Sequence, residues 1–222
     1  DGRTPLEETL QALDDLIRSG KVRYIGCSNF SAWHLMQALW IADRNDLTPF
    51  ISQQLYYSLQ ARDIENELVP LAVDQGLGIL VWSPIAGGLL SGKYRRGVDA
   101  PAGSRHLSEW SEPPVYDQDK LYDIIEELIA TGSDHGVSAA QVALAYTLAK
   151  PAVSSVIAGA RTEDQLADNL AAADLTLSAE EIDRLDKVSA QPLPYPFWHH
   201  AKAANDRLSP ADLTLLAPHI TG

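Results

Sequence analysis

The 222-residue sequence contains a single cysteine, Cys27, so it cannot form an internal disulfide. One thiol in a chain of this length is typical of a reducing compartment, and we expect a cytoplasmic protein. No stretch approaches the ~20 apolar residues of a membrane-spanning helix, and the opening residues show no secretory signal pattern. The sequence therefore predicts no membrane partner.

Positive charge is also scarce, because 17 Lys and Arg residues face 30 Asp and Glu residues, for a net charge of -13. This balance argues against nucleic acid as a partner, since nucleic-acid-binding proteins present a basic face. The six histidines and the lone cysteine show no zinc-ligand spacing, so we expect no metal. The G-x-G-x-x-G pattern of the common dinucleotide-binding fold is absent as well.

What the sequence does have is a regular alternation of apolar strands and helical repeats. Strands are predicted at residues 21–30, 50–59, 76–82 and 152–159. A helical repeat follows each strand, and an additional helix opens the chain. Thr4 is its predicted cap, with Pro5 at the first helical position and Glu7 at capping-box spacing. The alternation predicts parallel strands joined by right-handed crossovers.

Two α/β architectures fit this order of elements, an open doubly wound sheet and a (β/α)8 barrel. A complete (β/α)8 or TIM barrel takes about 250 residues and eight strands, so four strands make half of one. The chain also opens on a helix that has no strand before it. We therefore expect further sequence upstream, on the order of four β/α units.

Residues 83–116 interrupt the alternation with a segment rich in Gly, Pro and Ser. A loop longer than about 12–15 residues is usually functional or disordered. The segment belongs to the stretch ILVWSPIAGGLLSGKYRR, in which Gly87 and Gly88 precede Lys93. A glycine turn and nearby cations suit a phosphate, and Arg161 adds a guanidinium after the fourth strand. In an acidic chain, this cluster of cations predicts a dinucleotide phosphate site.

Polar side chains follow the predicted strands where the strands end. Ser28 and Asn29 follow the first strand, Gln54 lies in the second, and Trp82 ends the third. Ligands gather at the carboxyl ends of parallel strands, where amides and hydroxyls can bond a carboxamide and tryptophan offers a flat face to a ring. Each residue also has a plainer interpretation, as a helix cap or as part of the core. Together with the phosphate signals, they predict NADP(H).

The stretches GKVRYIGCSNF, QLYYSL, ILVWSPIAGGLLSGKY and VIAGARTEDQLADNL resemble the aldo/keto reductases. The resemblance is greatest to the branch that includes potassium-channel β subunits and bacterial NADP-dependent members, and it extends from about Thr4 to Val188. It implies a TIM barrel to which this chain supplies roughly the C-terminal four β/α units. Residues 1–222 would then be the C-terminal portion of one domain, with 83–116 as a loop over the cofactor and the tail 189–222 as a substrate loop.

The resemblance also implies a reaction and a set of binding residues. The reaction is the NADP(H)-dependent reduction of aldehydes and ketones to alcohols, with a small carbonyl compound as substrate and a homo-oligomer as an open question. The cofactor contacts implied are Ser28, Asn29 and Gln54 at the carboxamide, Trp82 on the nicotinamide, Ser83, Pro84, Ile85, Ala86, Gly87 and Lys93 at the pyrophosphate, Arg105 over the cofactor, and Gly159, Arg161, Gln165, Asp168 and Asn169 at the adenosine end. The substrate contacts are Tyr195, Phe197 and Trp198, in the stretch LPYPFWHH at 193–200, which we expect to be irregular.

This sequence departs from the family pattern in three respects. Asp168 stands where many members have glutamate, and Arg161 stands where the channel subunits have serine, which favours the 2′-phosphate. The family's aspartate, tyrosine, lysine and histidine cannot be matched, so no catalytic residue is assigned and the proton donor is expected upstream. Tyr56 and Tyr57 follow Gln54 and do not match that tyrosine. Two alternatives remain open, a non-catalytic NADP(H)-binding regulatory subunit and an inactive fragment.

Overall fold

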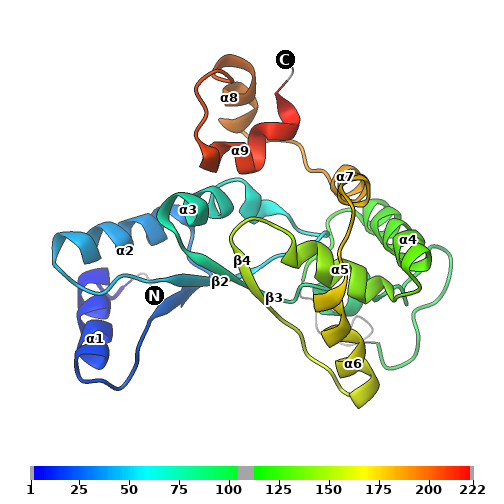
Figure 1. Cartoon of the computed structure of the whole chain (residues 1–222), viewed down its shortest axis with the longest axis horizontal. Helices are drawn as coiled ribbons and strands as arrows, with labels where there is room; N and C mark the ends of the chain where they lie inside the picture. Colours follow the sequence, from blue (N-terminus) through cyan, green and yellow to red (C-terminus); the bar gives the residue numbers. More distant parts are fainter. Residues whose placement is uncertain (1–2, 105–112, 221–222) are drawn as a thin grey trace. The chain divides into compact units, whose positions relative to one another are not determined.

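The computed structural model describes residues 3–104 and 113–220 (Figure 1). Its strands form one sheet in the order β1-β2-β3-β4, and β1 pairs with β2 in parallel, with Ser28 opposite Gln54. The strands are β1 (Gly26–Ser28), β2 (Ser52–Tyr56), β3 (Gly78–Trp82) and β4 (Val153–Ile157). Helices separate neighbouring strands, which is the α/β architecture that the alternation predicts.

The helices begin largely where short polar side chains precede apolar repeats. Asp117, Ser138 and Thr162 each accept a bond from a backbone N–H in the first turn of α4, α5 and α6. The predicted capping box at Thr4 is wrong, because Pro5 is extended (ψ 136°) and takes the N-cap position itself. The helices are α1 (Leu6–Arg18), α2 (Ala32–Arg44), α3 (Leu68–Gln75), α4 (Gln118–His135), α5 (Ala139–Leu148), α6 (Glu163–Ala171), α7 (Ala179–Val188), α8 (Phe197–Ala203) and α9 (Pro210–Leu216).

The chain divides into two compact units. Unit 1 consists of residues 1–55, 64–80 and 193–222, and unit 2 consists of residues 56–63 and 81–192. Among the described residues, none of the helices has the length and apolarity that crossing a bilayer requires.

Unit 1 contains α1, α2 and α3, together with the tail helices α8 and α9. The buried carboxylate of Asp14 holds α1 in place, because it accepts bonds from the backbone N–H (3.0 Å) and hydroxyl (2.7 Å) of Thr48 and from Arg18. In the tail, α9 packs against α3 (Figure 1). The expectation of an irregular stretch at 193–200 is wrong from Phe197, where α8 begins. Ser209 and Asp212 form a capping box around Pro210, a helix-start signal that the sequence already contained.

Unit 2 is built around an apolar core that α4, α5 and α7 share with the segment after β3. That segment is partly ordered, because residues Ala86–Ser91 form short 3₁₀ turns that kink at Gly87 and Gly88, and the side chains of Leu89 and Leu90 are buried. The core keeps the end of β3 and the following turn in a fixed position. This arrangement places the glycine turn at the carboxyl end of the sheet.

Candidate functional site

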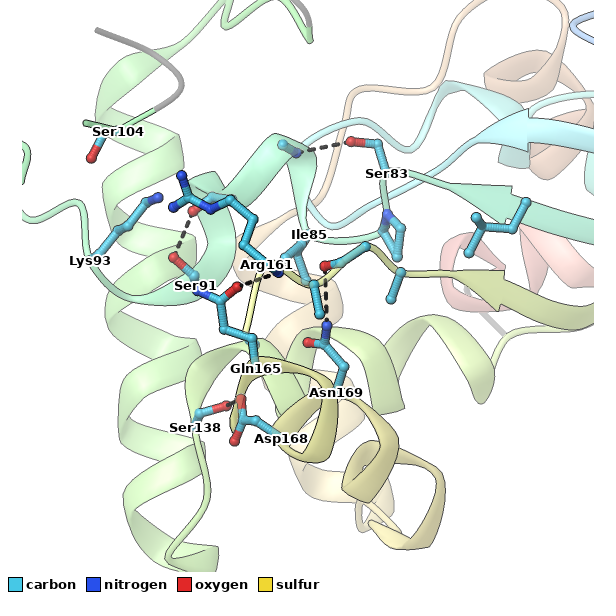
Figure 2. A pocket seen from close by; sticks show the side chains of 18 of the residues that line it. Ser83, Ile85, Ser91, Lys93, Ser104, Ser138, Arg161, Gln165, Asp168 and Asn169 are labelled. Atoms are coloured by element: carbon cyan, nitrogen blue, oxygen red, sulfur yellow. Dashed lines mark hydrogen bonds between the residues drawn. The ribbon is translucent and has the colours of Figure 1, made fainter. Parts of the chain in front are cut away.

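A cavity of about 1010 Å³ opens in unit 2 at the carboxyl ends of β3 and β4 (Figure 2). Among the residues predicted to contact a cofactor, the cavity is lined by Trp82, Ser83, Pro84, Ile85, Gly87, Lys93, Gly159, Arg161, Gln165, Asp168 and Asn169. Parts of the chain that are far apart in sequence therefore meet around one cavity.

The turn after β3 reverses the chain at the cavity wall. Ser83 and Ala86 have φ values of 54° and 50°, which are uncommon for residues other than glycine. Gly87 follows with φ 63°, and its N–H donates to the hydroxyl of Ser83 at 2.9 Å. Gly88 has φ 99°, and its N–H donates to the carbonyl of Ile85 at 2.9 Å. The turn is thus held by its own hydrogen bonds. Ala86 points away from the cavity lining and is fully buried in the core.

Two cationic side chains reach the cavity from two separate segments of unit 2. Lys93 follows the 3₁₀ helix, and Arg161 precedes the first turn of α6. Figure 2 shows both head groups directed to the same side of the cavity. The ammonium of Lys93 lies over Gly88, where an added Cβ would be 3.4 Å from the Lys93 nitrogen. A glycine beneath one cation and a second cation directed to the same side make this end of the cavity suitable for an anion.

The end of β4 and the start of α6 form another part of the cavity wall. Thr162 caps the helix, and the side-chain oxygen of Gln165 accepts the backbone N–H of Arg161 at 2.9 Å. The amide of Asn169 donates to the carbonyl of Gly159 at 3.4 Å. These bonds fold the end of β4 back onto α6, so that polar groups of both elements border the cavity.

Asp168 is directed toward α5. One of its oxygens accepts the hydroxyl of Ser138 at 2.7 Å, and the other accepts the amide of Gln141 at 2.8 Å. The carboxylate therefore connects two helices in addition to lining the cavity. The sequence predicts Ser138 only as the start of a helix, and the fold adds its hydrogen bond to Asp168.

Ser28, Asn29 and Gln54 lie together in unit 1, where β1 and β2 end. The hydroxyl of Ser28 and the backbone N–H of Asn29 donate to the carbonyl of Gln54, at 3.2 and 3.0 Å. Asn29 has φ 55°, a conformation that asparagine tolerates better than most residues. The neighbouring Gln53 is buried and donates to the carbonyl of Leu68, so the two glutamines face opposite sides of the sheet.

The predicted substrate residues lie in the tail of unit 1. Tyr195 and Trp198 are 74% and 51% exposed, whereas Phe197 packs against the small apolar cluster of Ala201, Leu215 and Leu216. Phe197 therefore contributes to the packing of the tail. Arg105, also predicted to contact the cofactor, lies outside the described residues.

Several lining residues escaped the sequence analysis. They include Ser91, Gly103, Ser104, Pro113, Ser138, Ala140, Ile157 and Ala158. Small and apolar side chains carry no individual chemical signal, so only the fold reveals them. Within residues 3–104 and 113–220, no three His, Cys, Asp or Glu side chains group as metal ligands.

Asp186, Tyr146 and Lys150 meet away from the cavity and resemble a catalytic group by residue type. Asp186 accepts the hydroxyl of Tyr146 at 2.5 Å and the ammonium of Lys150 at 2.6 Å. Arg62 also pairs with Asp186 at 3.2 Å. Because Tyr146 is completely buried, its hydroxyl cannot reach a substrate, and the group links α5 to α7.

The parallel α/β sheet, with a cavity at the carboxyl ends of its strands, has the architecture of part of a (β/α)8 barrel. A model of the aldo/keto reductase family matches residues 1–190, and the chain belongs to this family. A crystal structure of the thermostable aldo-keto reductase Tm1743, in complex with the inhibitor epalrestat, agrees with a TM-score of 0.64 at 27% identity. The match covers 85% of this chain and 56% of that one. The expected fold class and family are confirmed.

Curated relatives show the same partial coverage. The chain is 38% identical to "Uncharacterized oxidoreductase YrpG" of Bacillus subtilis, over 86% of this chain and 56% of that protein. It is 36% identical to "Versiconal hemiacetal acetate reductase" of Aspergillus parasiticus, over 84% of this chain and 54% of that protein. It is 38% identical to "Probable voltage-gated potassium channel subunit beta" of Oryza sativa subsp. japonica, over 85% of this chain and 58% of that protein. The chain therefore spans about half the length of the curated relatives it matches.

Proposed function

We propose that this chain forms the cofactor-binding part of an NADP(H)-dependent aldo/keto reductase that converts aldehydes or ketones to alcohols. The observation that carries the proposal is the cavity at the ends of β3 and β4, which collects the turn after Trp82, the cation Lys93 and the start of α6. Residues 1–222 would be the C-terminal portion of a single barrel domain.

The cavity suits a dinucleotide phosphate by the chemistry of its lining. Lys93, whose ammonium lies at the cavity wall beside Gly88, would interact with the pyrophosphate. Arg161 would pair with the 2′-phosphate, because its guanidinium presents a planar fork of donors. Gln165 and Asn169 would border the adenosine. Ser28, Asn29 and Gln54 offer the donors and acceptors that a carboxamide requires.

In the proposed reaction, this chain would hold the hydride donor, and the proton donor is not among its residues. Bound NADPH would supply the hydride that reduces the carbonyl carbon. Trp82 would keep the nicotinamide ring flat against one wall and exclude water from that face. We assign the proton for the carbonyl oxygen to none of this chain's residues, and the family resemblance assigns it to an aspartate, tyrosine, lysine and histidine upstream.

The substrate is proposed to be a flat or apolar carbonyl compound. Tyr195 and Trp198 are exposed aromatic side chains in the tail, and such surfaces favour contact with flat ligands. In the complete enzyme, Trp198→Ala should raise KM for aromatic aldehydes and leave KM for short aliphatic aldehydes nearly unchanged. An unchanged KM for both would remove Trp198 from the substrate site.

NADPH binding to the 222-residue chain tests the proposal. We expect the fluorescence of NADPH to change on titration, with a dissociation constant in the range of tens of micromolar or below, and no turnover with benzaldehyde. The double variant Lys93→Met/Arg161→Ala is the control that should lose binding while retaining the far-UV circular dichroism of the parent. Absence of binding by the unmodified chain would contradict the proposed cofactor role.

A further inference from the structure

Tyr56 lies behind the aromatic wall of the cavity, at the end of β2. Its ring stacks on that of Trp82, with centroids 4.9 Å apart and planes inclined by 29°. Trp82 lines the cavity, whereas Tyr56 does not. The tyrosine ring therefore packs on the tryptophan ring without itself lining the cavity, and stacked aromatic rings of this kind attract each other.

The direction of the hydrogen bonds at Tyr56 follows from its neighbours. The carbonyl oxygen of Pro114 can only accept, so Gln60 must direct its NH₂ group to that oxygen, at 2.8 Å. The other end of the amide, Oε1, then faces the hydroxyl of Tyr56 at 2.8 Å, and the hydroxyl must donate. Ser58 donates to the same hydroxyl oxygen at 3.2 Å.

The hydroxyl of Tyr56 stays protonated across the physiological pH range. Burial of the ring raises the pKa of Tyr56 to about 12, with only partial opposition from the hydrogen bond of Ser58. A neutral hydroxyl can therefore act as donor to Gln60 throughout this range. The tyrosine is thus suited to a structural bond and unsuited to proton transfer near neutral pH.

Gln60 connects this aromatic pair to a second part of the cavity wall. Its bond to Pro114 joins residues 54 positions apart in the sequence. Pro113, which precedes the bonded carbonyl, lines the cavity and is buried. One stack and two hydrogen bonds therefore connect the ring of Trp82 to the backbone beside Pro113.

We propose that Tyr56 is a positioning residue that fixes the plane of the Trp82 ring, and that Gln60 couples this ring to the wall at Pro113. This inference rests on the proposed function, in which Trp82 contacts the nicotinamide. Tyr56 contributes through Trp82 and does not touch the cofactor. The stack sets the tilt of the Trp82 ring. The two hydrogen bonds of Gln60 keep this ring at a constant distance from the wall at Pro113.

Two variants of Tyr56 separate the stack from the hydrogen bonds. Tyr56→Leu removes the ring, and NADPH affinity should fall about threefold to tenfold, as expected for an aromatic pair. Tyr56→Phe keeps the ring and removes the bond to Gln60, and the affinity should stay within about threefold of the parent. Gln60→Leu should match Tyr56→Phe. Tyr116→Phe, at a side chain that is 91% exposed, is the control and should change nothing.

Measurements without cofactor test the positioning separately. In chain labelled with 5-fluorotryptophan, the Trp82 resonance, assigned with Trp82→Phe, should shift in Tyr56→Leu and stay near its parent position in Tyr56→Phe. The carbonyl carbon resonance of Pro114, which accepts the bond from Gln60, should shift in Gln60→Leu. Circular dichroism confirms that each variant folds.

The outcomes distinguish this inference from the proposed function. If the parent chain does not bind NADPH, the proposed function fails, and the fluorine data still decide whether Tyr56 positions Trp82. If the Trp82 resonance and the NADPH affinity are both unchanged in Tyr56→Leu, the positioning role is overturned. If the carbonyl carbon resonance of Pro114 is unchanged in Gln60→Leu, the coupling to the wall at Pro113 is overturned.

Discussion

The hydroxyl of Ser138 donates a hydrogen bond of 2.7 Å to the carboxylate of Asp168 and thereby joins the first turn of α5 to α6. The same hydroxyl accepts the backbone N–H of Gln141 at 3.1 Å, and the side chain of Gln141 donates to the other carboxylate oxygen. A single carboxylate thus organises the wall of the cavity where α5 begins. Asp168 is therefore part of a local hydrogen-bond network.

Asp168→Ala should destabilise unit 2, because the buried amide of Gln141 would lose its acceptor. We expect a decrease of about 1–3 kcal/mol in the free energy of unfolding, the usual cost of an unpaired buried polar group. Urea denaturation followed by circular dichroism measures it. The exposed Asp164 on the same helix offers the control Asp164→Ala, with an expected loss below about 1 kcal/mol. Equal losses in the two variants would contradict the structural role of Asp168.

Arg161→Ala should weaken the binding of NADPH much more than that of NADH. A bond to a charged group contributes about 1.5–3 kcal/mol, so the affinity for NADPH should fall about tenfold or more, whereas NADH lacks the 2′-phosphate. Fluorescence titration of both cofactors gives the ratio. A parallel loss for the two nucleotides would remove Arg161 from the 2′-phosphate.

Lys93→Met should weaken NADPH and NADH alike, because both carry the pyrophosphate that we assign to this ammonium. The expected loss is about tenfold or more in low salt and should be smaller in high salt, where charges are screened. Arg95→Met, at an exposed cation in the same segment, is the matched control. Unequal losses for the two cofactors would place Lys93 at a different phosphate.

Gly26→Ala should disturb the pairing that holds Ser28 beside Gln54. A Cβ at this position would lie 2.9 Å from the backbone oxygen and 2.5 Å from the hydroxyl of Ser52. We expect a loss of about 1–3 kcal/mol in the free energy of unfolding. Adding Ser52→Ala should not restore stability, because the backbone oxygen remains. Full recovery in the double variant would show that only the hydroxyl is in conflict.

Acid should weaken the contact between α4 and α7 at Glu181. The backbone N–H of Ser178 and, to a lesser extent, His135 hold the pKa of Glu181 below its ordinary value of 4.5. A lowered pKa means that the stabilisation is complete above about pH 4.5 and is lost as the pH falls through the folded-state value. Glu181→Gln should therefore be less stable than the parent at pH 7, by a margin that shrinks toward pH 3.

Urea midpoints at pH 7, 5, 4 and 3 measure this margin. Glu180→Gln, at the exposed neighbouring glutamate, is the control. A margin for Glu181→Gln that stays constant from pH 7 to pH 3 would rule out the proposed contribution.

Local patterns in the sequence predict a strand or a helix start well where the residues of one short segment determine it. The apolar runs around Ile79 and Val156 become β3 and β4, and Ser138 and Thr162 begin helices as short polar residues do. The predicted strand at 21–30 shrinks to Gly26–Ser28, since strand length depends on pairing with a neighbour. Propensity alone does not contain that information.

The candidate site was predictable only in part. The resemblance to a family identified Lys93, Arg161 and Gln165, which the fold brings to one cavity. The stack of Tyr56 on Trp82 could not be predicted, because it joins two strands whose register is fixed by the rest of the sheet. Pairing between residues distant in sequence becomes visible only in three dimensions.

The division of unit 1 into three stretches of chain affects how the protein folds during synthesis. Helix α3 leaves the ribosome well before α9, its packing partner, has been translated. The 81–192 stretch of unit 2 is contiguous and can condense while the tail is still being made. Nascent chains stalled before residue 193 should therefore carry an uncovered apolar helix, and we expect such chains to depend on chaperones.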